Sequence, residues 1–125
     1  MLERVDPDLR PYLRDLLDWL FDDWTSCSTL DGMAQQRGHE PSEAREVGLA
    51  VIAVGFDNDW FVPGELKPRF VQWEGGPTGW LERIASAWPV GRYLEIGEVC
   101  WFDLTDSGKA VATAVLDERY GPDAV

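Results

Sequence analysis

The chain has 125 residues, of which 23 are Asp or Glu and 11 are Lys or Arg, so its formal net charge is −12. Hydrophobic residues make up 45% of the sequence, and this apolar content excludes a mainly disordered chain. A general binder of nucleic acid or of anionic membranes usually carries the opposite charge. The length predicts a single domain over residues 1–125.

Neither a secretion signal nor a membrane span is evident. The N-terminus reads MLERVDPDLRP, with acids and prolines where a signal peptide would be apolar. The longest apolar run, Gly48–Phe56, has nine residues, whereas a membrane-spanning helix needs roughly 20. The two cysteines, Cys27 and Cys100, allow at most one disulfide and are expected as buried thiols. We therefore expect a cytoplasmic protein of bacterial type that does not bind membranes.

Apolar residues recur at spacings of three and four in three segments, which indicates helices over Asp8–Trp24, Thr78–Trp88 and Asp106–Arg119. A fourth helix is predicted over Glu43–Phe56, which is apolar on all sides after a polar first turn. A short helix is expected around residues 30–34. The expected N-terminal caps of the four long helices are Asp8, Ser42, Thr78 and Thr105.

The pattern changes between residues 61 and 104. Phe61–Leu66 is interpreted as a turn followed by a short helix, with Pro63 near its start. Alternation of apolar and polar residues over Arg92–Leu104 predicts a β-hairpin whose turn lies near Glu95–Glu98.

The order of short helix, helix, hairpin and helix over residues 62–115 resembles a winged-helix domain. The segment Phe102-Asp103-Leu104-Thr105-Asp106-Ser107-Gly108-Lys109-Ala110 is similar to the Leu-Thr-x-x-Gly junction that follows the wing in MarR-like and PadR-like regulators. The resemblance implies an α+β fold, with a winged-helix-like part over residues 62–120 behind extra N-terminal helices in residues 1–61. The N-terminal helices are expected to pack with the last helix. The alternative is a homodimer, which N- and C-terminal helices form in MarR-like regulators.

The resemblance also implies how DNA would be bound, with Thr78–Trp88 in the major groove and Glu95–Glu98 as the wing tip. Phosphate contacts usually come from Lys and Arg, yet this wing tip carries two Glu. Residues 65–92 carry only one more basic residue than acidic ones. We therefore favour a non-enzymatic protein-interaction module of regulatory or antagonist type, with a DNA-binding regulator as the alternative. The candidate DNA contacts are Lys67, Arg69, Thr78, Arg83, Ser86 and Arg92.

The candidate surface for a protein partner is the acidic face of the first helix. Asp15, Asp18 and Asp22 recur at helical spacing, and Asp23 follows them. Such a face is either a solvated surface or a docking site for a basic partner, which charge complementarity would steer. Most of the tryptophans are expected in the core, with a partner surface as the alternative; they are Trp19, Trp24, Trp73, Trp80, Trp88 and Trp101.

Catalytic chemistry has little support in the sequence. His39 is the only histidine, and Ser26, Cys27 and Ser28 precede it without an evident orienting group. A zinc site needs about four ligands, and His39 with the two cysteines supplies three. We expect no catalytic residue, no metal and no cofactor, and keep an acid-dependent pocket enzyme as a third class.

Overall fold

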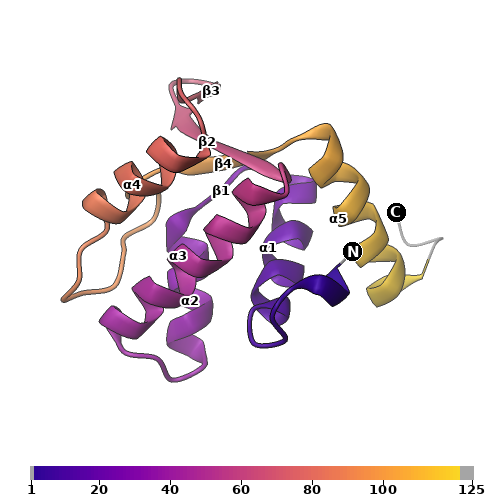
Figure 1. The fold of residues 1–125 in the computed structure, drawn as a ribbon, viewed down its shortest axis with the longest axis horizontal. Helices are drawn as coiled ribbons and strands as arrows, with labels where there is room; N and C mark the ends of the chain where they lie inside the picture. The colour runs from indigo at the N-terminus through magenta and orange to yellow at the C-terminus, as the bar shows by residue number, and fades with distance from the viewer. Residues whose placement is uncertain (1, 122–125) are drawn as a thin grey trace.

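The computed structural model describes residues 2–121, which form an α+β fold with five α-helices and a four-stranded antiparallel sheet (Figure 1). The helices are α1 (Arg10–Asp22), α2 (Cys27–Gln36), α3 (Pro41–Asp57), α4 (Pro77–Ala87) and α5 (Asp106–Tyr120), and a 3-10 turn, η1, covers Leu2–Arg4. The strands are β1 (Thr25–Ser26), β2 (Phe61–Leu66), β3 (Phe70–Gln72) and β4 (Trp101–Leu104). The α+β class predicted from the sequence is therefore confirmed.

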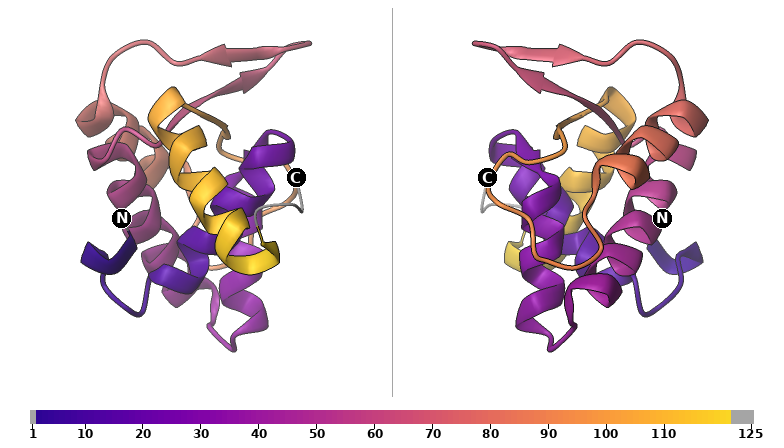
Figure 2. Two further views of the ribbon diagram at one scale, coloured as in Figure 1. Left: turned by 90° about the vertical axis from the view of Figure 1, so that its right-hand side faces the viewer. Right: turned by 90° about the vertical axis from the view of Figure 1, so that its left-hand side faces the viewer.

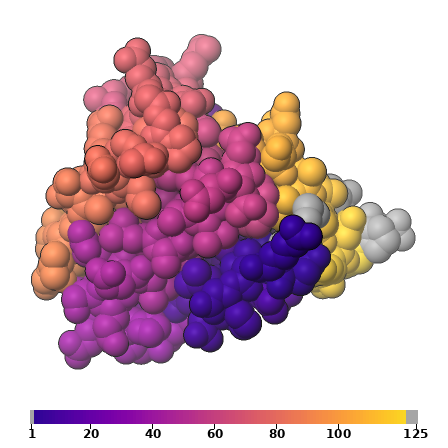
Figure 3. Space-filling model, in the orientation of Figure 1, coloured from indigo at the N-terminus to yellow at the C-terminus, as the bar shows by residue number. Residues whose placement is uncertain are grey.

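The helices form most of the body. α1 packs against α5, and α2 and α4 both pack against α3. The buried residues of α1 include the predicted stripe of Leu13, Leu16, Leu17 and Leu20, because this spacing places them on one face. In the space-filling view α3 crosses the middle of the visible face, with α4 on one side and the N-terminal segment on the other (Figure 3).

The helix starts differ in how they are capped. Thr105 is the predicted cap of α5, and its hydroxyl accepts a hydrogen bond from the Gly108 nitrogen at 2.9 Å. At α3 the cap is Glu40, which exchanges hydrogen bonds with Glu43 in a reciprocal capping box. The remaining predicted caps, Asp8, Ser42 and Thr78, were wrong, because α1, α3 and α4 begin after Leu9, Glu40 and Gly76.

The sheet order is β1-β4-β2-β3, and β2, one of its two inner strands, replaces the turn and short helix predicted at Phe61–Leu66. β2 pairs with β4 from Phe61↔Leu104 to Gly64↔Trp101. It pairs with β3 only from Gly64↔Gln72 onwards. Pro63 is tolerated in β2 because its nitrogen points to the side where β3 has already ended.

The hairpin predicted over Arg92–Leu104 was also wrong. Only Trp101–Leu104 forms a strand, and residues 89–100 follow an irregular path. The observed hairpin is β2–β3, which extends beyond the helical body (Figure 2). Glu95–Glu98 is therefore a turn in a surface segment and not the tip of a two-stranded wing. Two of the elements on which the winged-helix resemblance rested are thus replaced by others.

Aromatic side chains fill the space between α3 and the sheet. Phe56 contacts Phe61, Phe102 and Trp80 edge to face, with ring centroids 5.4 to 6.2 Å apart. The prediction of a core position was wrong for two tryptophans: Trp19 is 63% exposed and Trp24 is 37% exposed. Within residues 2–121, no helix is long and apolar enough to cross a membrane.

Candidate functional site

Half of the acidic face of α1 is neutralised from within the protein. The Arg119 guanidinium on α5 bonds the carboxylates of Asp15 and, at 2.9 Å, Asp18. Arg37 approaches Asp15 at 3.4 Å, and the Tyr120 hydroxyl donates to Asp18 at 2.9 Å. The hydrogen bonds that Arg119 donates to Asp15 and Asp18 raise the pKa of its guanidinium above the ordinary value. These two aspartates therefore hold α5 against α1, and Arg119 and Arg37 compensate their negative charge.

The other half of this face keeps its charge and carries an exposed tryptophan. Asp22 has no ion pair or hydrogen bond among the described residues, and Asp23 accepts a hydrogen bond only from the Trp24 backbone, at 2.8 Å. Trp19 lies between Asp18 and Asp22 in the sequence, and the three line a hollow of about 300 Å³. We call Asp18, Trp19, Asp22, Asp23 and Trp24 the α1 acidic surface.

A second hollow continues this surface towards the sheet. It has a volume of about 240 Å³, and its lining includes Asp22, Asp23, Trp24 and Asp103 together with Lys109. Asp103 on β4 thus adds a carboxylate from a distant part of the chain. Because Asp22 lines both hollows, the two form one acidic region along the end of α1.

The basic residues proposed for DNA are arranged differently. Lys67 and Arg83 both pair with Glu65, at 3.4 and 3.8 Å. Arg83 also lies over the ring of Trp73, 3.6 Å from its centroid, which is a cation–π contact. Lys67 and Arg83 were expected to contact DNA phosphates, but in the structure they contact Glu65 and Trp73 instead.

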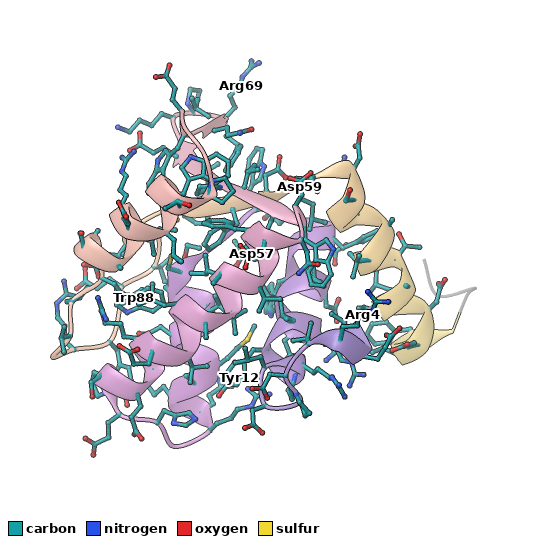
Figure 4. The ribbon with its side chains drawn as sticks, viewed as in Figure 1. Arg4, Tyr12, Asp57, Asp59, Arg69 and Trp88 are labelled. Carbon is teal, nitrogen blue, oxygen red and sulfur yellow. The ribbon has the colours of Figure 1, made fainter. Side chains whose placement is uncertain are left out.

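The remaining DNA candidates do not form one surface. Arg69 projects from the β2–β3 hairpin (Figure 4) and has no ion pair among the described contacts. Arg92 lies after the C-terminal end of α4. Its two terminal guanidinium nitrogens donate to the two carboxylate oxygens of Glu98, at 2.6 and 2.8 Å. Thr78 and Ser86 are exposed on α4. Lys67, Arg69 and Arg83 therefore share the hairpin region, while Arg92 is separate.

Within residues 2–121, the Ser and Cys side chains considered as partners of His39 contact other groups. The backbone oxygen of His39 accepts a hydrogen bond from the Tyr93 hydroxyl at 2.6 Å. Ser26 bonds Ser28, and Cys27 contacts Cys100, so their side chains face partners other than His39. Across residues 2–121, no three His, Cys, Asp or Glu side chains group closely enough to hold a metal ion.

Asp31 is a buried carboxylate that was not predicted from the sequence. It is 1% exposed, and one oxygen accepts a hydrogen bond from the Leu94 nitrogen at 2.6 Å, while the other has no described partner. Burial raises its pKa above the ordinary value. Its position between Leu30 and Met33, inside a short apolar stretch, was the only signal available in the sequence. Its role is to hold the 89–100 segment on α2.

Comparison with known proteins does not identify a family for this chain. No family model, curated protein or solved structure matches the chain. The resemblance to MarR-like and PadR-like regulators therefore has no support from a matching protein, and the functional conclusion rests on the surfaces described above.

Proposed function

We propose that the protein is a non-enzymatic interaction module that binds a basic protein partner through the α1 acidic surface. The observation that carries this proposal is Trp19, which is 63% exposed beside Asp22, whose carboxylate has no ion pair among the described residues. An indole exposed to this extent forgoes the free energy that burial would provide. Tryptophan is also among the residues most often found as binding hot spots.

The surroundings of Trp19 indicate the chemistry of the partner. Asp22 and Asp23 are exposed and form no ion pair with a described residue, and the whole chain carries a net charge of −12. A Lys or Arg side chain placed over the indole would gain a cation–π contact and meet these carboxylates. The wider negative field would raise the association rate of a basic surface.

Such a module acts by covering a surface of its partner, as a regulator or an antagonist does. A cytoplasmic location belongs to this proposal, and it is supported by two cysteines that are not joined in a disulfide. A winged-helix-like scaffold and a homodimer belong to this proposal as finer expectations. The scaffold is supported by α4 and α5, which lie close to where the sequence predicted helices.

The proposal is tested by NMR titration of the full chain with a defined Arg- and aromatic-rich peptide. We expect the Trp19 indole N–H and the amides of Asp22 and Asp23 to shift, while the indole signal of buried Trp88 stays in place. Trp19→Ala should weaken binding at least tenfold, as loss of a hot-spot side chain does. Asp22→Asn combined with Asp23→Asn should weaken binding and reduce its dependence on salt.

The matched control is Asp57→Asn, which removes one exposed carboxylate from the end of α3 (Figure 4). This variant should bind the peptide as the unmodified protein does. If Asp57→Asn weakened binding as much as the α1 variants, or if shifts were spread over all acidic residues, the attraction would be a property of net charge and the proposed surface would be wrong.

The alternative function, DNA binding, is favoured by one observation: Lys67 and Arg83 share Glu65, and Arg69 projects from the same β2–β3 hairpin. The test is binding of mixed-sequence duplex DNA at about 50 and 200 mM salt, over which phosphate-driven binding falls steeply. Arg69→Glu is the preferred variant, because Arg83 also packs on Trp73. Tight binding at the lower salt that Arg69→Glu abolishes would replace our proposal with the alternative.

A further inference from the structure

The two cysteines of the chain are placed opposite each other although 73 positions separate them. β1 pairs with β4 through Thr25↔Phe102 and Ser26↔Trp101. The next step of this antiparallel register brings Cys27 opposite Cys100, and the Cys27 nitrogen donates to the Cys100 oxygen at 3.3 Å. The two Sγ atoms are 3.6 Å apart, and both residues are buried.

This arrangement is close to that of a disulfide. Directly opposed residues of an antiparallel pair have Cβ atoms about 4.5 to 5.5 Å apart, and a disulfide joins Cβ atoms about 3.5 to 4.5 Å apart with sulfurs about 2.05 Å apart. The sulfurs therefore need to approach by roughly 1.5 Å. The chain has no third cysteine, so no competing pair exists within one molecule.

We propose that Cys27 and Cys100 are a reversible redox site, at which a hydroperoxide oxidises the two thiols to an intramolecular disulfide. This inference is independent of the α1 acidic surface. In the first step the thiolate of one cysteine attacks the peroxide, the O–O bond breaks, and a sulfenic acid forms as hydroxide leaves. In the second step the other thiolate attacks the sulfenic sulfur, the S–S bond forms and the S–O bond breaks. Hydroxide leaves in this step as well, and the two hydroxides take up the two thiol protons, so hydrogen peroxide is reduced to two waters.

Cys100 is the last residue of the 89–100 segment that leads to β4, so release of this segment would move its thiol. Leu94 and Gly97 anchor it through hydrogen bonds to Asp31, at 2.6 Å, and to the Ser26 hydroxyl, at 3.3 Å. Val99, next to Cys100, has a φ of 76°, a region that β-branched residues rarely occupy. This strain favours transient release of the segment, which exposes a thiol to the oxidant. When the segment returns, the register brings the second sulfur to the first.

The test uses the full-length protein, first reduced and then incubated with hydrogen peroxide at 37 °C under native conditions. After removal of the peroxide, the protein is denatured in the presence of an alkylating agent, and its intact mass is measured. We expect a monomer that is two hydrogens lighter and takes up no alkylating agent, with Cys27 and Cys100 joined in the peptide map. Dithiothreitol should restore two alkylatable thiols.

A second readout checks that the native fold accommodates the bond. The oxidised protein should melt roughly 10 °C above the reduced one, because the bond closes a long loop of the unfolded chain. The amides of Leu94 and Gly97 should exchange more slowly, since Cys100 is then tied to α2. Cys100→Ser, which cannot form the bond, should show neither change under the same treatment.

Three results would overturn the proposal. The first is a protein whose two thiols are both alkylated after peroxide treatment. The second is oxidation to sulfinic or sulfonic acid without the S–S bond. The third is a linked protein that melts at or below the temperature of the reduced form. The wild-type chain alone distinguishes all three, so the conclusion does not depend on whether a cysteine variant folds.

Discussion

The α1 acidic surface and the β2–β3 hairpin carry opposite charges, and they differ in how much of that charge is already paired. At α1, Arg119 compensates Asp15 and Asp18, while Asp22 keeps a free carboxylate beside the exposed Trp19. At the hairpin, Glu65 pairs with Lys67 and Arg83, and Trp73 covers Arg83. Arg69 alone among these cations has no described ion pair.

The comparison shows why the sum of charges along a segment is a poor guide to binding. Residues 65–92 are the least acidic part of the sequence, yet three of their four cations already pair with Glu65 or Glu98. α1 loses half of its acidic face to internal pairs and still offers free carboxylates next to an aromatic ring. What a partner meets is the charge that remains after internal pairing, so the acidic surface is the better candidate.

The largest expected effect comes from Gly64→Ala in β2, which should disrupt the β2–β3 hairpin and leave the α1 acidic surface intact. A Cβ at this position would lie 2.3 Å from the backbone oxygen of Val71, so β3 must move away. We expect a loss of about 3 kcal/mol in the free energy of unfolding, measured by urea denaturation. Peptide binding at Trp19 should persist in the fraction that remains folded.

Gly79→Ala is the matched control for that substitution. Gly79 lies within α4, and a Cβ there would meet nothing within 4 Å. Because alanine is the better helix former, this variant should gain roughly 0.5–1 kcal/mol. Equal losses in the two variants would mean that the close approach of β2 and β3 does not control stability.

The positions of α1, α3, α4 and α5 were predictable because each depends on local signals. The leucines of α1 repeat at the helical period, and the side chain of Thr105 caps α5 through Gly108 three residues later. Trp19 shares its side of α1 with Asp15, Asp18 and Asp22 rather than with the leucines. Its exposure was therefore available from the same periodicity, although a core position was predicted.

The sheet could not be predicted in the same way, because its contacts join distant residues. Pro63 and Gly64 are typical of a turn when only neighbours are considered, but β2 is formed by pairing with β4, about forty residues later. Similarly, the alternating residues after Arg92 would suit a strand. Asp31, 63 positions away, instead binds Leu94 and holds this segment on α2. The pairing of Lys67 and Arg83 with Glu65 was hidden for the same reason.

A smaller effect is expected from Arg83→Ala, which separates packing from charge at the hairpin. The side chain covers Trp73 and pairs with Glu65, so its loss should cost about 1 kcal/mol of unfolding free energy. Arg69→Ala removes the same charge from an unpaired position and should change stability by less than about 0.5 kcal/mol. Equal effects in the two variants would show that the contact with Trp73 contributes nothing.

The dependence of the melting temperature on pH tests whether Arg92 is also held by an internal partner, Glu98. The hydrogen bond from Arg92 lowers the pKa of Glu98 to about 2 from its ordinary 4.5. A carboxyl whose pKa is lower in the folded state stabilises the fold above its unfolded pKa, and this contribution is lost as the pH falls. The wild-type melting temperature should therefore fall between about pH 4.5 and 2. Glu98→Gln should reduce this dependence on pH. If the melting temperature of the variant fell just as steeply, the Arg92–Glu98 pair would not contribute to stability.

The finest distinction is between two aspartates of the same helix, Asp18 and Asp22. Asp18 bonds Arg119 and the Tyr120 hydroxyl, so Asp18→Asn should cost roughly 0.5–1 kcal/mol of unfolding free energy. Asp22 has no described partner, so Asp22→Asn should leave stability within about 0.5 kcal/mol and weaken peptide binding more than Asp18→Asn does. Urea denaturation and NMR titration of both variants would separate the carboxylate that maintains the fold from the one available to a partner. The opposite ranking in binding would move the contact surface towards Arg119 and Tyr120.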